Sequence, residues 1–594
     1  MSQPRREYER RLKIRQQNAD QLRCRDKRYS QLRLMAGGAI LVAIWIVLGP
    51  VWIGAAWIFL PLAVLVALIV VHANLRRKLA RAERAVDYYR TGMARLEGSW
   101  QGTGRSDFRW ESESHLYAAD LDLFGPGSLF ERLSSARTRV GEETLARWLC
   151  HPAQPDEVRT RQEAVEELRG RLDLREDLAV LGEGVQSRIH LEELIAWANQ
   201  HSDWDFRLSS WIAPLLVLLS WSALMAGYFL GFSYFPWLPA VAIQIGFALC
   251  QRHRVLEVVE QVDRPERGLE LLSQVLQRLE QESFESPLLQ KLSRGLQTEG
   301  RPPWRQISRL ALYMDLLDSR LNQMFGLLSA LLLWTTQLAM AIETWRRANG
   351  SQIEGWLTAL GELEALSSLS GYAYENPSDP FPSIVEEGVC FLAEDIGHPL
   401  IPDAALVRNS LSLGKGLQLL VVSGSNMSGK STLLRTVGIN SVLALAGAPV
   451  RARRLKMSRL MIGATVRVQD SLQQGVSRFY AEITRLRHIF EEAERGRPVL
   501  FLLDEILHGT NSHDRAIGAQ AVIRSLVERG AIGLVTTHDL ALAQVAESLS
   551  PQAANVHFVD HLEKGQLAFD YRLHQGVVRK SNALELMRAV GLRV

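Results

Sequence analysis

The chain has 594 residues, which is more than one typical domain holds, so we expect two or more folded units. Its formal net charge of +3 gives no general indication of nucleic-acid binding. The four cysteines, Cys24, Cys150, Cys250 and Cys390, are scattered without metal-ligand spacing, which argues against a cysteine-based zinc module and a disulfide framework and fits reduced thiols in the cytosol.

The N-terminal part combines a basic tail with a long uncharged stretch. Residues 1–33 contain eleven Lys and Arg residues against four acidic residues. The stretch 34–71 carries no charged side chain over 38 residues, whereas one membrane-spanning helix needs only about 20. Gly49-Pro50 lies near its middle, where a tight turn would fall. The pattern predicts a cytoplasmic tail followed by a transmembrane hairpin over 34–72, and its length argues against a signal peptide.

Basic residues also follow this hairpin. Arg76, Arg77 and Lys78 lie in a basic linker segment, 73–114, in which we expect residues 75–97 to leave the membrane as a helix. Because Lys and Arg gather on the cytoplasmic side of membrane helices, this segment and the tail both predict a cytoplasmic N-terminus. Residues 115–208 are rich in Leu, Arg and Glu at helical spacing, which predicts a helical core.

A second long uncharged run covers residues 211–250 and is interrupted at 231–236. It predicts a second transmembrane hairpin over 209–250, and a helical lever region is expected to follow over 251–375. The alternative for both uncharged runs is a buried hairpin in a soluble core, but runs of this length favour the membrane. We therefore expect a multi-pass protein of the inner or plasma membrane.

A third uncharged stretch, 323–342, is 20 residues long. It contains several polar residues, namely Gln323, Ser329, Thr335, Thr336 and Gln337. Two hairpins return the chain to the cytoplasm, so one further single span would place the downstream nucleotide site described below outside the cell, where there is no ATP. The sequence therefore predicts a buried soluble helix here rather than a span.

A phosphate-binding motif lies in the C-terminal part, 380–594, where short apolar β runs alternate with helices and predict an α/β domain. After the apolar run 417–423 comes Gly424-Ser425-Asn426-Met427-Ser428-Gly429-Lys430-Ser431-Thr432. This is the G-x-x-x-x-G-K-[ST] pattern in its strand–loop–helix setting, whose backbone amides surround phosphate oxygens. We expect Lys430 to reach the β- and γ-phosphates and Ser431 to bind Mg²⁺, so the predicted cofactors are ATP and Mg²⁺.

Two further apolar runs end in polar residues suited to the same site. The run 499–503 leads into Asp504 and Glu505, and the run 532–537 leads into His538. Asp504 suits the Mg²⁺ shell, while Glu505 suits the orientation or deprotonation of an attacking water. An isolated histidine is more often structural, but beside a γ-phosphate His538 is a candidate to sense or stabilise the transferred group.

These motifs resemble those of the MutS family of DNA mismatch repair ATPases. The similar residues are Asn426-Met427 within the phosphate loop, Asp504-Glu505 with Gly509, Thr510 and Asp514, Thr537-His538, Lys580-Ser581, His398-Pro399 and Asn409. The segment 475–482 is similar to the family segment whose serine reaches the partner subunit's γ-phosphate. The resemblance thus implies a homodimer in which Ser477 completes the neighbouring site. A weaker resemblance to the family's helical core covers about 115–370.

The chain also departs from the family pattern. A basic tail and a hairpin stand where the family has its mismatch-reading domain, we find no segment that fits the family's DNA clamp, and Leu406 stands where an aromatic often stacks on adenine. The expected architecture is multidomain: transmembrane helical hairpins, an all-α core and lever, and an α/β ATPase domain of the P-loop, ABC-related type.

Three functions follow as hypotheses. The resemblance implies an ATP-dependent, DNA-binding, mismatch-repair-like ATPase that is tethered to the membrane, with hydrolysis driving dimer closure. The alternative is a membrane switch that binds no DNA and acts on membrane helices or protein partners. An ABC-type transporter fits least, because only two hairpins are predicted. We expect the tail to meet anionic lipid, since it abuts a span, whereas the basic stretch 451–456 suits DNA, lipid or solvent.

Overall fold

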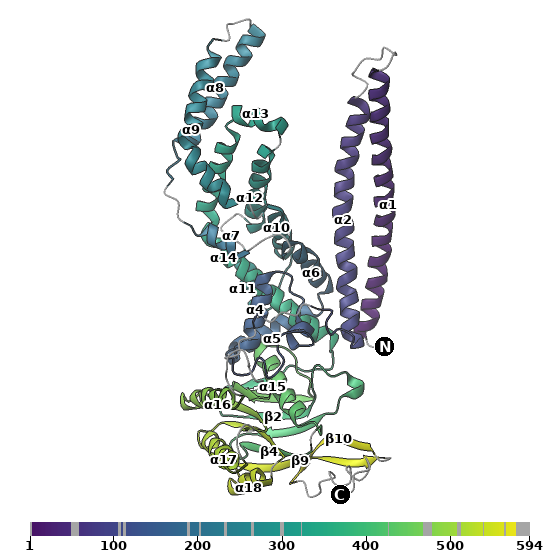
Figure 1. Cartoon of the computed structure of the whole chain (residues 1–594), viewed down its shortest axis with the longest axis vertical. Helices are drawn as coiled ribbons and strands as arrows, with labels where there is room; N and C mark the ends of the chain where they lie inside the picture. The colour runs from purple at the N-terminus through teal and green to yellow at the C-terminus, as the bar shows by residue number, and fades with distance from the viewer. Residues whose placement is uncertain are drawn as a thin grey trace.

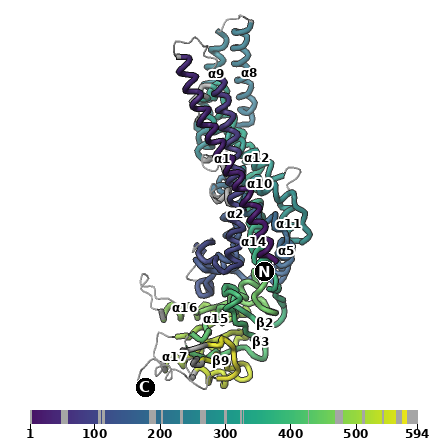
Figure 2. The backbone as a smooth tube through the Cα atoms, turned by 90° about the vertical axis from the view of Figure 1, so that its right-hand side faces the viewer, coloured from purple at the N-terminus to yellow at the C-terminus, as the bar shows by residue number. Residues whose placement is uncertain are grey.

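The structure is a computed structural model. It describes all residues except 1–2, 49–58, 105–108, 111–114, 187–190, 201–203, 231–234, 263–265, 297–301, 322, 426, 467–477, 508–511, 539, 564–565 and 578–594. The molecule is elongated, with an α/β domain at one end, a helical core next to it, and two helical arms that reach the opposite end (Figure 1). A view turned by 90° shows the N-terminus beside the helical core, at the base of the arms (Figure 2).

The first arm is an antiparallel pair of helices, α1 (Gln3–Leu48) and α2 (Phe59–Glu97). The basic tail and the uncharged run form one continuous helix, because the tail contains neither Gly nor, after Pro4, Pro to interrupt it. The basal half of the pair is held by Tyr8 packing edge-on against Tyr89. Helix α2 ends at Glu97, where the basic helix expected over 75–97 was predicted to end.

Short helices form the core, and a second arm extends from it. The core helices are α3 (Leu129–Leu133), α4 (Arg139–Cys150), α5 (Pro155–Arg169), α6 (Leu172–Gln186) and α7 (Leu191–Ala198). The second arm contains α8 (Ser209–Leu230), α9 (Trp237–Val262), α10 (Glu266–Glu280), α11 (Pro287–Gly295), α12 (Pro303–Asp318), the 3₁₀ turn Ser319–Leu321, α13 (Gln323–Leu331) and α14 (Trp334–Glu375). Helix α14 has 42 residues, about 63 Å, and packs along both core and arm helices.

The uncharged stretch 323–342 is not one helix, which corrects that sequence prediction. Helix α13 ends at Leu331 and α14 begins at Trp334, while Leu333 between them has φ 49° in the left-handed region. Trp334 turns back toward α12, and its indole nitrogen donates to the carbonyl of Leu316 at 2.8 Å. The stretch is also only partly buried, since Leu328 is 39% exposed.

Large apolar side chains are exposed along the distal halves of both arms. By length and composition, three of the described helices are apolar enough to cross a membrane: Gln3–Val47, Phe59–Glu97 and Ser209–Phe229. Helix α9, the partner of α8, is not among them, and its charged residues begin at Arg252. Trp45 and Trp211 are 76% and 80% exposed, which is unusual for tryptophans in water.

The C-terminal domain contains two sheets. A four-stranded sheet has the order β1 (Ser383–Val385), β5 (Arg454–Ser458), β2 (Phe391–Ile396) and β3 (Asn409–Leu413). The six-stranded sheet has the order β10 (Gln566–Gln575), β9 (Ala553–Glu563), β4 (Leu419–Ser423), β8 (Ile532–Thr537), β7 (Val499–Asp504) and β6 (Met461–Thr465). Four helices pack around it: α15 (Lys430–Ala446), α16 (Arg478–Glu494), α17 (Ser512–Glu528) and α18 (Leu540–Ser548).

Strand order in the larger sheet positions the candidate site. β4, β8 and β7 are parallel neighbours, and nearly every residue in them is buried. Strands buried on both faces read as continuous apolar runs, which is why the sequence revealed them. Their carboxyl ends meet at one edge of the sheet, where ligands of such α/β domains bind. The predicted helical region followed by an α/β domain is therefore the observed architecture.

Candidate nucleotide-binding site

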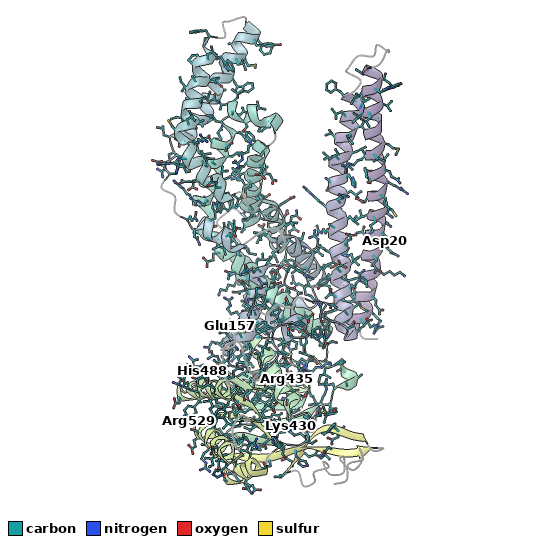
Figure 3. All side chains as sticks on the ribbon, viewed as in Figure 1. Asp20, Glu157, Lys430, Arg435, His488 and Arg529 are labelled. Atoms are coloured by element: carbon teal, nitrogen blue, oxygen red, sulfur yellow. The ribbon has the colours of Figure 1, made fainter. Side chains whose placement is uncertain are left out.

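The phosphate loop connects β4 to α15 and has the backbone shape that its glycines permit. Gly429, the N-cap of α15, has φ 102°, a conformation that side chains rarely allow. The ammonium of Lys430 donates to the carbonyls of Gly424 and Ser425, both at 3.0 Å, so its side chain crosses the loop. Figure 3 labels Lys430 in the α/β end of the molecule. The loop thus encloses a cation at the amino end of a 17-residue helix.

Polar atoms in this loop fit a phosphate. The hydroxyls of Ser425 and Ser428 are buried and have no hydrogen-bond partner among the described residues. Buried polar groups are normally paired, so two such hydroxyls beside Lys430 indicate a site built for an additional acceptor. Asn426 lies outside the described residues, whereas Met427 is 86% exposed at the mouth of the loop.

The carboxyl ends of β7 and β8 bring the other predicted residues to the loop. The Oε1 atom of Glu505 lies 3.5 Å from the ammonium of Lys430 and 3.3 Å from Nδ1 of His538. Glu505 has φ 47°, a left-handed conformation that is uncommon for glutamate and recurs at functional sites. All three predicted catalytic side chains therefore meet at one point, although they come from three separate segments.

A threonine that sequence reasoning missed holds the acidic pair in place. The hydroxyl of Thr536 donates to the carboxylate of Asp504, and it accepts from the backbone amide of Glu505 at 3.0 Å. Thr536 is fully buried in β8, next to the β7 residues it binds. The signal in the sequence was the threonine pair directly before His538, because a hydroxyl at a strand end can bind the next strand's terminus.

A cavity of about 690 Å³ adjoins the loop, and it holds the candidate metal ligands. Ser431, Thr432, Asp504 and Glu505 all line it. Among the described residues, no cluster of three or more His, Cys, Asp or Glu side chains could bind a metal alone. This arrangement suits Mg²⁺, which proteins usually hold through one or two side chains together with substrate phosphates and water.

Apolar side chains and aromatic rings also line the cavity. Leu406 lies against Gly397, whereas Tyr571 of β10 lies against Gly429 of the phosphate loop. Tyr571 has φ 55° at an irregularity in the β9–β10 register, and its carbonyl accepts from the Asn409 side chain at 3.0 Å. Phe558 and Tyr571 thus supply aromatic rings at the cavity, although both lie far from Leu406 in sequence and neither was predicted.

His398 also lines the cavity and is neutral near pH 7. Burial, together with the nearby Arg435 guanidinium, lowers the pKa of this imidazole to about 4. One ring nitrogen, Nδ1, accepts from the backbone amide of Leu400 at 3.3 Å. A neutral imidazole with one occupied nitrogen has a single remaining polar atom, which suits hydrogen bonding to an uncharged ring of a nucleotide.

Several predicted residues lie outside the described part of the chain: Ser477, Gly509, Thr510 and the Lys580-Ser581 pair. Their roles remain predictions. Helix α16 begins at Arg478, directly after Ser477, and it is tied to the site from its first turns. The carboxylate of Glu482 accepts from the backbone amide of Leu507 at 2.6 Å, so the segment that follows Ser477 contacts the loop after Glu505.

A parallel β core, a phosphate loop at one strand end and acidic residues at the next strand define a P-loop nucleotide-binding domain. Comparison with known proteins identifies the type. Residues 420–593 match the family model described as MutS domain V. The C-terminal domain of this chain belongs to the MutS family, as its motifs indicated.

Similar proteins carry MutS or MutS2 names. An Endonuclease MutS2 of Thermus thermophilus is 36% identical over 203 residues, which is 33% of this chain and 25% of that protein. An Endonuclease MutS2 of Carboxydothermus hydrogenoformans is 32% identical over 248 residues, 41% of this chain and 31% of that protein. A DNA mismatch repair protein MutS of Natronomonas pharaonis is 33% identical over 249 residues, 41% of this chain and 28% of that protein. The chain thus spans about a quarter to a third of these relatives' lengths.

Proposed function

We propose that this protein is a membrane-tethered MutS-type ATPase that passes its nucleotide state to two helical arms. The observation that supports ATP hydrolysis is the meeting of Lys430, Glu505 and His538 at the phosphate loop, with distances of 3.5 and 3.3 Å to the Glu505 carboxylate. The test is Mg²⁺-dependent ATP hydrolysis by the purified full chain in lipid nanodiscs. Absence of nucleotide-dependent phosphate release above that of Lys430→Ala would refute the proposal.

Each residue has a role that its position supports. Lys430 offsets charge on the β- and γ-phosphates, while Ser431 and Asp504 would hold Mg²⁺, which supplies charge neutralisation at the same oxygens. Glu505 is placed to orient or deprotonate the attacking water, and Thr536 fixes its backbone. The imidazole of His538 contacts the Glu505 carboxylate at 3.3 Å, so His538 can orient this base or respond to the γ-phosphate.

Exposed apolar side chains support the membrane location. Leu41 and Trp45 on α1 are 70% and 76% exposed, and Leu215 and Leu218 on α8 are 63% and 64% exposed. Contiguous exposed apolar surface of this extent marks an interaction site, and uncharged helices of this length match a bilayer. Both arms point away from the α/β domain (Figure 1), so a single membrane can hold both while the nucleotide site stays in the cytoplasm.

Buried ion pairs offer a route from the nucleotide site to the first arm. The carboxylate of Glu375, the last residue of α14, forms ion pairs with the guanidinium groups of Arg95 in α2 and Arg132 in α3, each at 2.7 Å. Its side chain is fully buried; burial raises the pKa of Glu375, but the two arginines outweigh this effect and hold the pKa below its ordinary value. The lever helix, the core and the membrane hairpin are therefore joined at one charged residue.

The same junction continues to the phosphate loop. Just after Glu375, Asn376 and Asp379 accept from the Arg451 guanidinium at 3.2 and 3.3 Å. The backbone amide of Arg451 in turn donates to the side chain of Asn440 at 2.8 Å, and Asn440 lies in α15, the helix that the loop begins. We infer that a shift of α15 on nucleotide binding is transmitted through these contacts to α14 and α2. A buried network with two arrangements is the physical requirement for such coupling.

We also propose that the protein forms a homodimer. Tyr480 and Ile483 on α16 and Ile517 on α17 are 64%, 40% and 56% exposed, and they flank the segments that precede these helices. We propose that this surface meets a second copy, with Ser477 completing the partner's site. The test mixes Ser477→Arg protein with Lys430→Ala protein, each inactive alone. Recovered hydrolysis supports shared sites, and full activity of Ser477→Arg at every protein concentration excludes them.

DNA binding is the second candidate, because the relatives carry the names DNA mismatch repair protein and endonuclease. Two basic segments that could serve it are partly engaged elsewhere. Arg451 is buried against Asp379, and the tail residues Arg15 and Arg23 pair with Glu176 and Glu83 at 2.7 and 2.9 Å. We therefore place the membrane switch first. Salt-dependent binding of a fluorescent duplex by the full chain would restore DNA as the ligand.

A further inference from the structure

The break between α13 and α14 lies within an uncharged stretch and has an unusual distribution of polarity. On α13, the exposed described positions Gly326, Leu328 and Ala330 are all apolar. The polar side chains of Ser329 on α13 and Thr336 on α14 are buried. A helical segment in water shows the opposite arrangement, with polar side chains outward. The surface around Leu328 thus suits apolar surroundings.

Side chains satisfy the backbone that the break leaves unpaired. The amide of Gln244 in α9 donates to the carbonyl of Leu331 at 2.5 Å, and the amide of Gln337 donates to the carbonyl of Leu332 at 2.7 Å. Gln244 is 2% exposed, in the middle of the uncharged part of α9. In water a broken helix end needs no such partners, but inside a bilayer irregular backbone persists only where protein groups bind it.

The lengths of the flanking segments agree with a position inside the membrane. Helix α13 has nine residues, and nine residues of α14 precede Glu343, which is roughly 14 Å of helix in each limb. That is about half the thickness of a hydrocarbon core. Gln244 lies eight residues from Arg252, the first charged residue of α9, or about 12 Å. The two groups joined by the hydrogen bond therefore lie at similar depths.

We propose that α13 and the first turns of α14 form a re-entrant element, which enters the bilayer from the ATPase side, turns at Leu332–Leu333 against Gln244 of α9, and returns to the same side with Leu328 in contact with lipid acyl chains. This inference rests on the proposed membrane location. It differs from both alternatives weighed from the sequence, a membrane span and a buried soluble helix. It keeps α12 and the C-terminal end of α14 on one side of the membrane, together with the nucleotide site.

The element would add protein to the membrane beside α8 and α9 at the end of the lever helix. Because α14 runs without interruption from Trp334 to Glu375, the re-entrant turn and the buried charges at Glu375 are the two ends of one helix. A movement of α14 driven from the ATPase domain would therefore displace groups at mid-bilayer depth.

Spin-label accessibility in vesicles tests the proposal. The four native cysteines are replaced by serine, and single cysteines carrying a nitroxide are placed at Leu328, at Leu312 on α12, and at Val42 and Leu218 on the proposed spans. All four positions are at least 39% exposed, so they form a matched set. Collision rates are measured with oxygen, which concentrates in acyl chains, and with a water-soluble nickel chelate. The sample is the full chain in phosphatidylcholine–phosphatidylglycerol vesicles.

We expect the labels at 328, 42 and 218 to favour oxygen and the label at 312 to favour nickel, with oxygen-to-nickel collision ratios that differ by about tenfold or more between the two groups. Nickel contact at 328 equal to that at 312, with 42 and 218 still in lipid, would overturn the re-entrant element and leave the membrane proposal intact. Low collision rates with both reagents at 328 would also overturn it, because they mark a protein interior. Nickel contact at 42 and 218 would instead refute the membrane location itself.

Discussion

The two ends of this molecule differ in which side chains they bury and which they expose. In the α/β domain β4, β7 and β8 are buried almost completely and the polar groups at their ends converge on one cavity. In the distal arms Trp45, Trp211 and Leu218 point outward while polar Gln244 is inside. The first pattern is that of a protein in water and the second is that expected in lipid, where apolar side chains lose nothing by exposure. The buried charges at Glu375 lie between these two regions, at the end of α14 that meets the core.

The largest effect is expected at the phosphate loop. Lys430→Ala should lower ATP hydrolysis by about a hundredfold or more, because the phosphates lose their main protein counter-ion in a partly enclosed site. Phosphate release from the full chain in nanodiscs measures this. Lys415→Ala, at an exposed lysine of the same domain, is the matched control and should keep normal turnover. Normal turnover in Lys430→Ala would remove the site assignment.

Glu505→Gln separates binding from chemistry within the same end of the molecule. The amide keeps the shape of the side chain but cannot accept a proton, so kcat should fall by about 10²–10⁴-fold while ATP still binds. Binding of a fluorescent ATP analogue and single-turnover hydrolysis give the two quantities. Exposed Glu547 supplies the control substitution Glu547→Gln. Equal losses of binding and turnover would show that Glu505 is structural.

At the junction, a buried pair and a surface pair can be compared directly. Glu375→Gln leaves Arg95 and Arg132 without their shared carboxylate, which should cost about 3–5 kcal/mol of stability. Glu97→Gln removes a half-exposed partner of Arg5 and should cost about 1 kcal/mol or less. Thermal unfolding in detergent measures both.

Acidification acts on the same carboxylate. Because the folded-state pKa of Glu375 lies below its unfolded value, its stabilising contribution is present above the ordinary glutamate pKa and is lost as the pH falls through the lower folded value. The acid sensitivity of unfolding should therefore be smaller in Glu375→Gln than in the wild type. Equal melting temperatures for Glu375→Gln and Glu97→Gln would contradict the role of the junction.

In the second arm, Gln244→Leu tests whether a buried amide is needed to pair the backbone at the break between α13 and α14. The variant leaves the Leu331 carbonyl without its partner, at a cost of about 1–3 kcal/mol where water cannot replace it. Gln17→Leu, on the exposed face of α1 below the uncharged run, should change stability by about 0.5 kcal/mol or less. Melting temperatures of both variants in nanodiscs give the comparison, and a neutral Gln244→Leu would mean that water reaches the break.

The smallest effect is expected for mismatch recognition. The segments before the helical core form a hairpin whose proposed surroundings are lipid, so no described domain is placed to insert a side chain into a bent duplex. Binding of G·T-containing and fully paired duplexes, compared at one stated salt concentration, should differ by about twofold or less. A strong preference for the mismatch would move the chain toward the repair function of its relatives.

The sequence by itself determined the features that depend on contiguous residues. The phosphate loop from Gly424 to Thr432 was recognisable because backbone amides, a lysine and a helix start act within nine consecutive positions. The buried strands before Asp504 and His538 were also visible, since strands covered on both faces are continuous apolar runs. The long uncharged stretches followed from the absence of charge alone.

Only the tertiary structure decided which distant residues meet. Thr536 of β8 binds Asp504 of the neighbouring strand β7, and Tyr571 approaches the loop from β10. Arg95 pairs with Glu375, which lies 280 positions away. No local sequence pattern indicates contacts between residues so far apart. The break at Leu333 was hidden for the same reason, because the nearby carbonyl of Leu331 accepts from Gln244 of another helix. A site made of consecutive residues can be recognised in the sequence. Side chains that compensate a strained or buried group, by contrast, can come from any segment that packs against it.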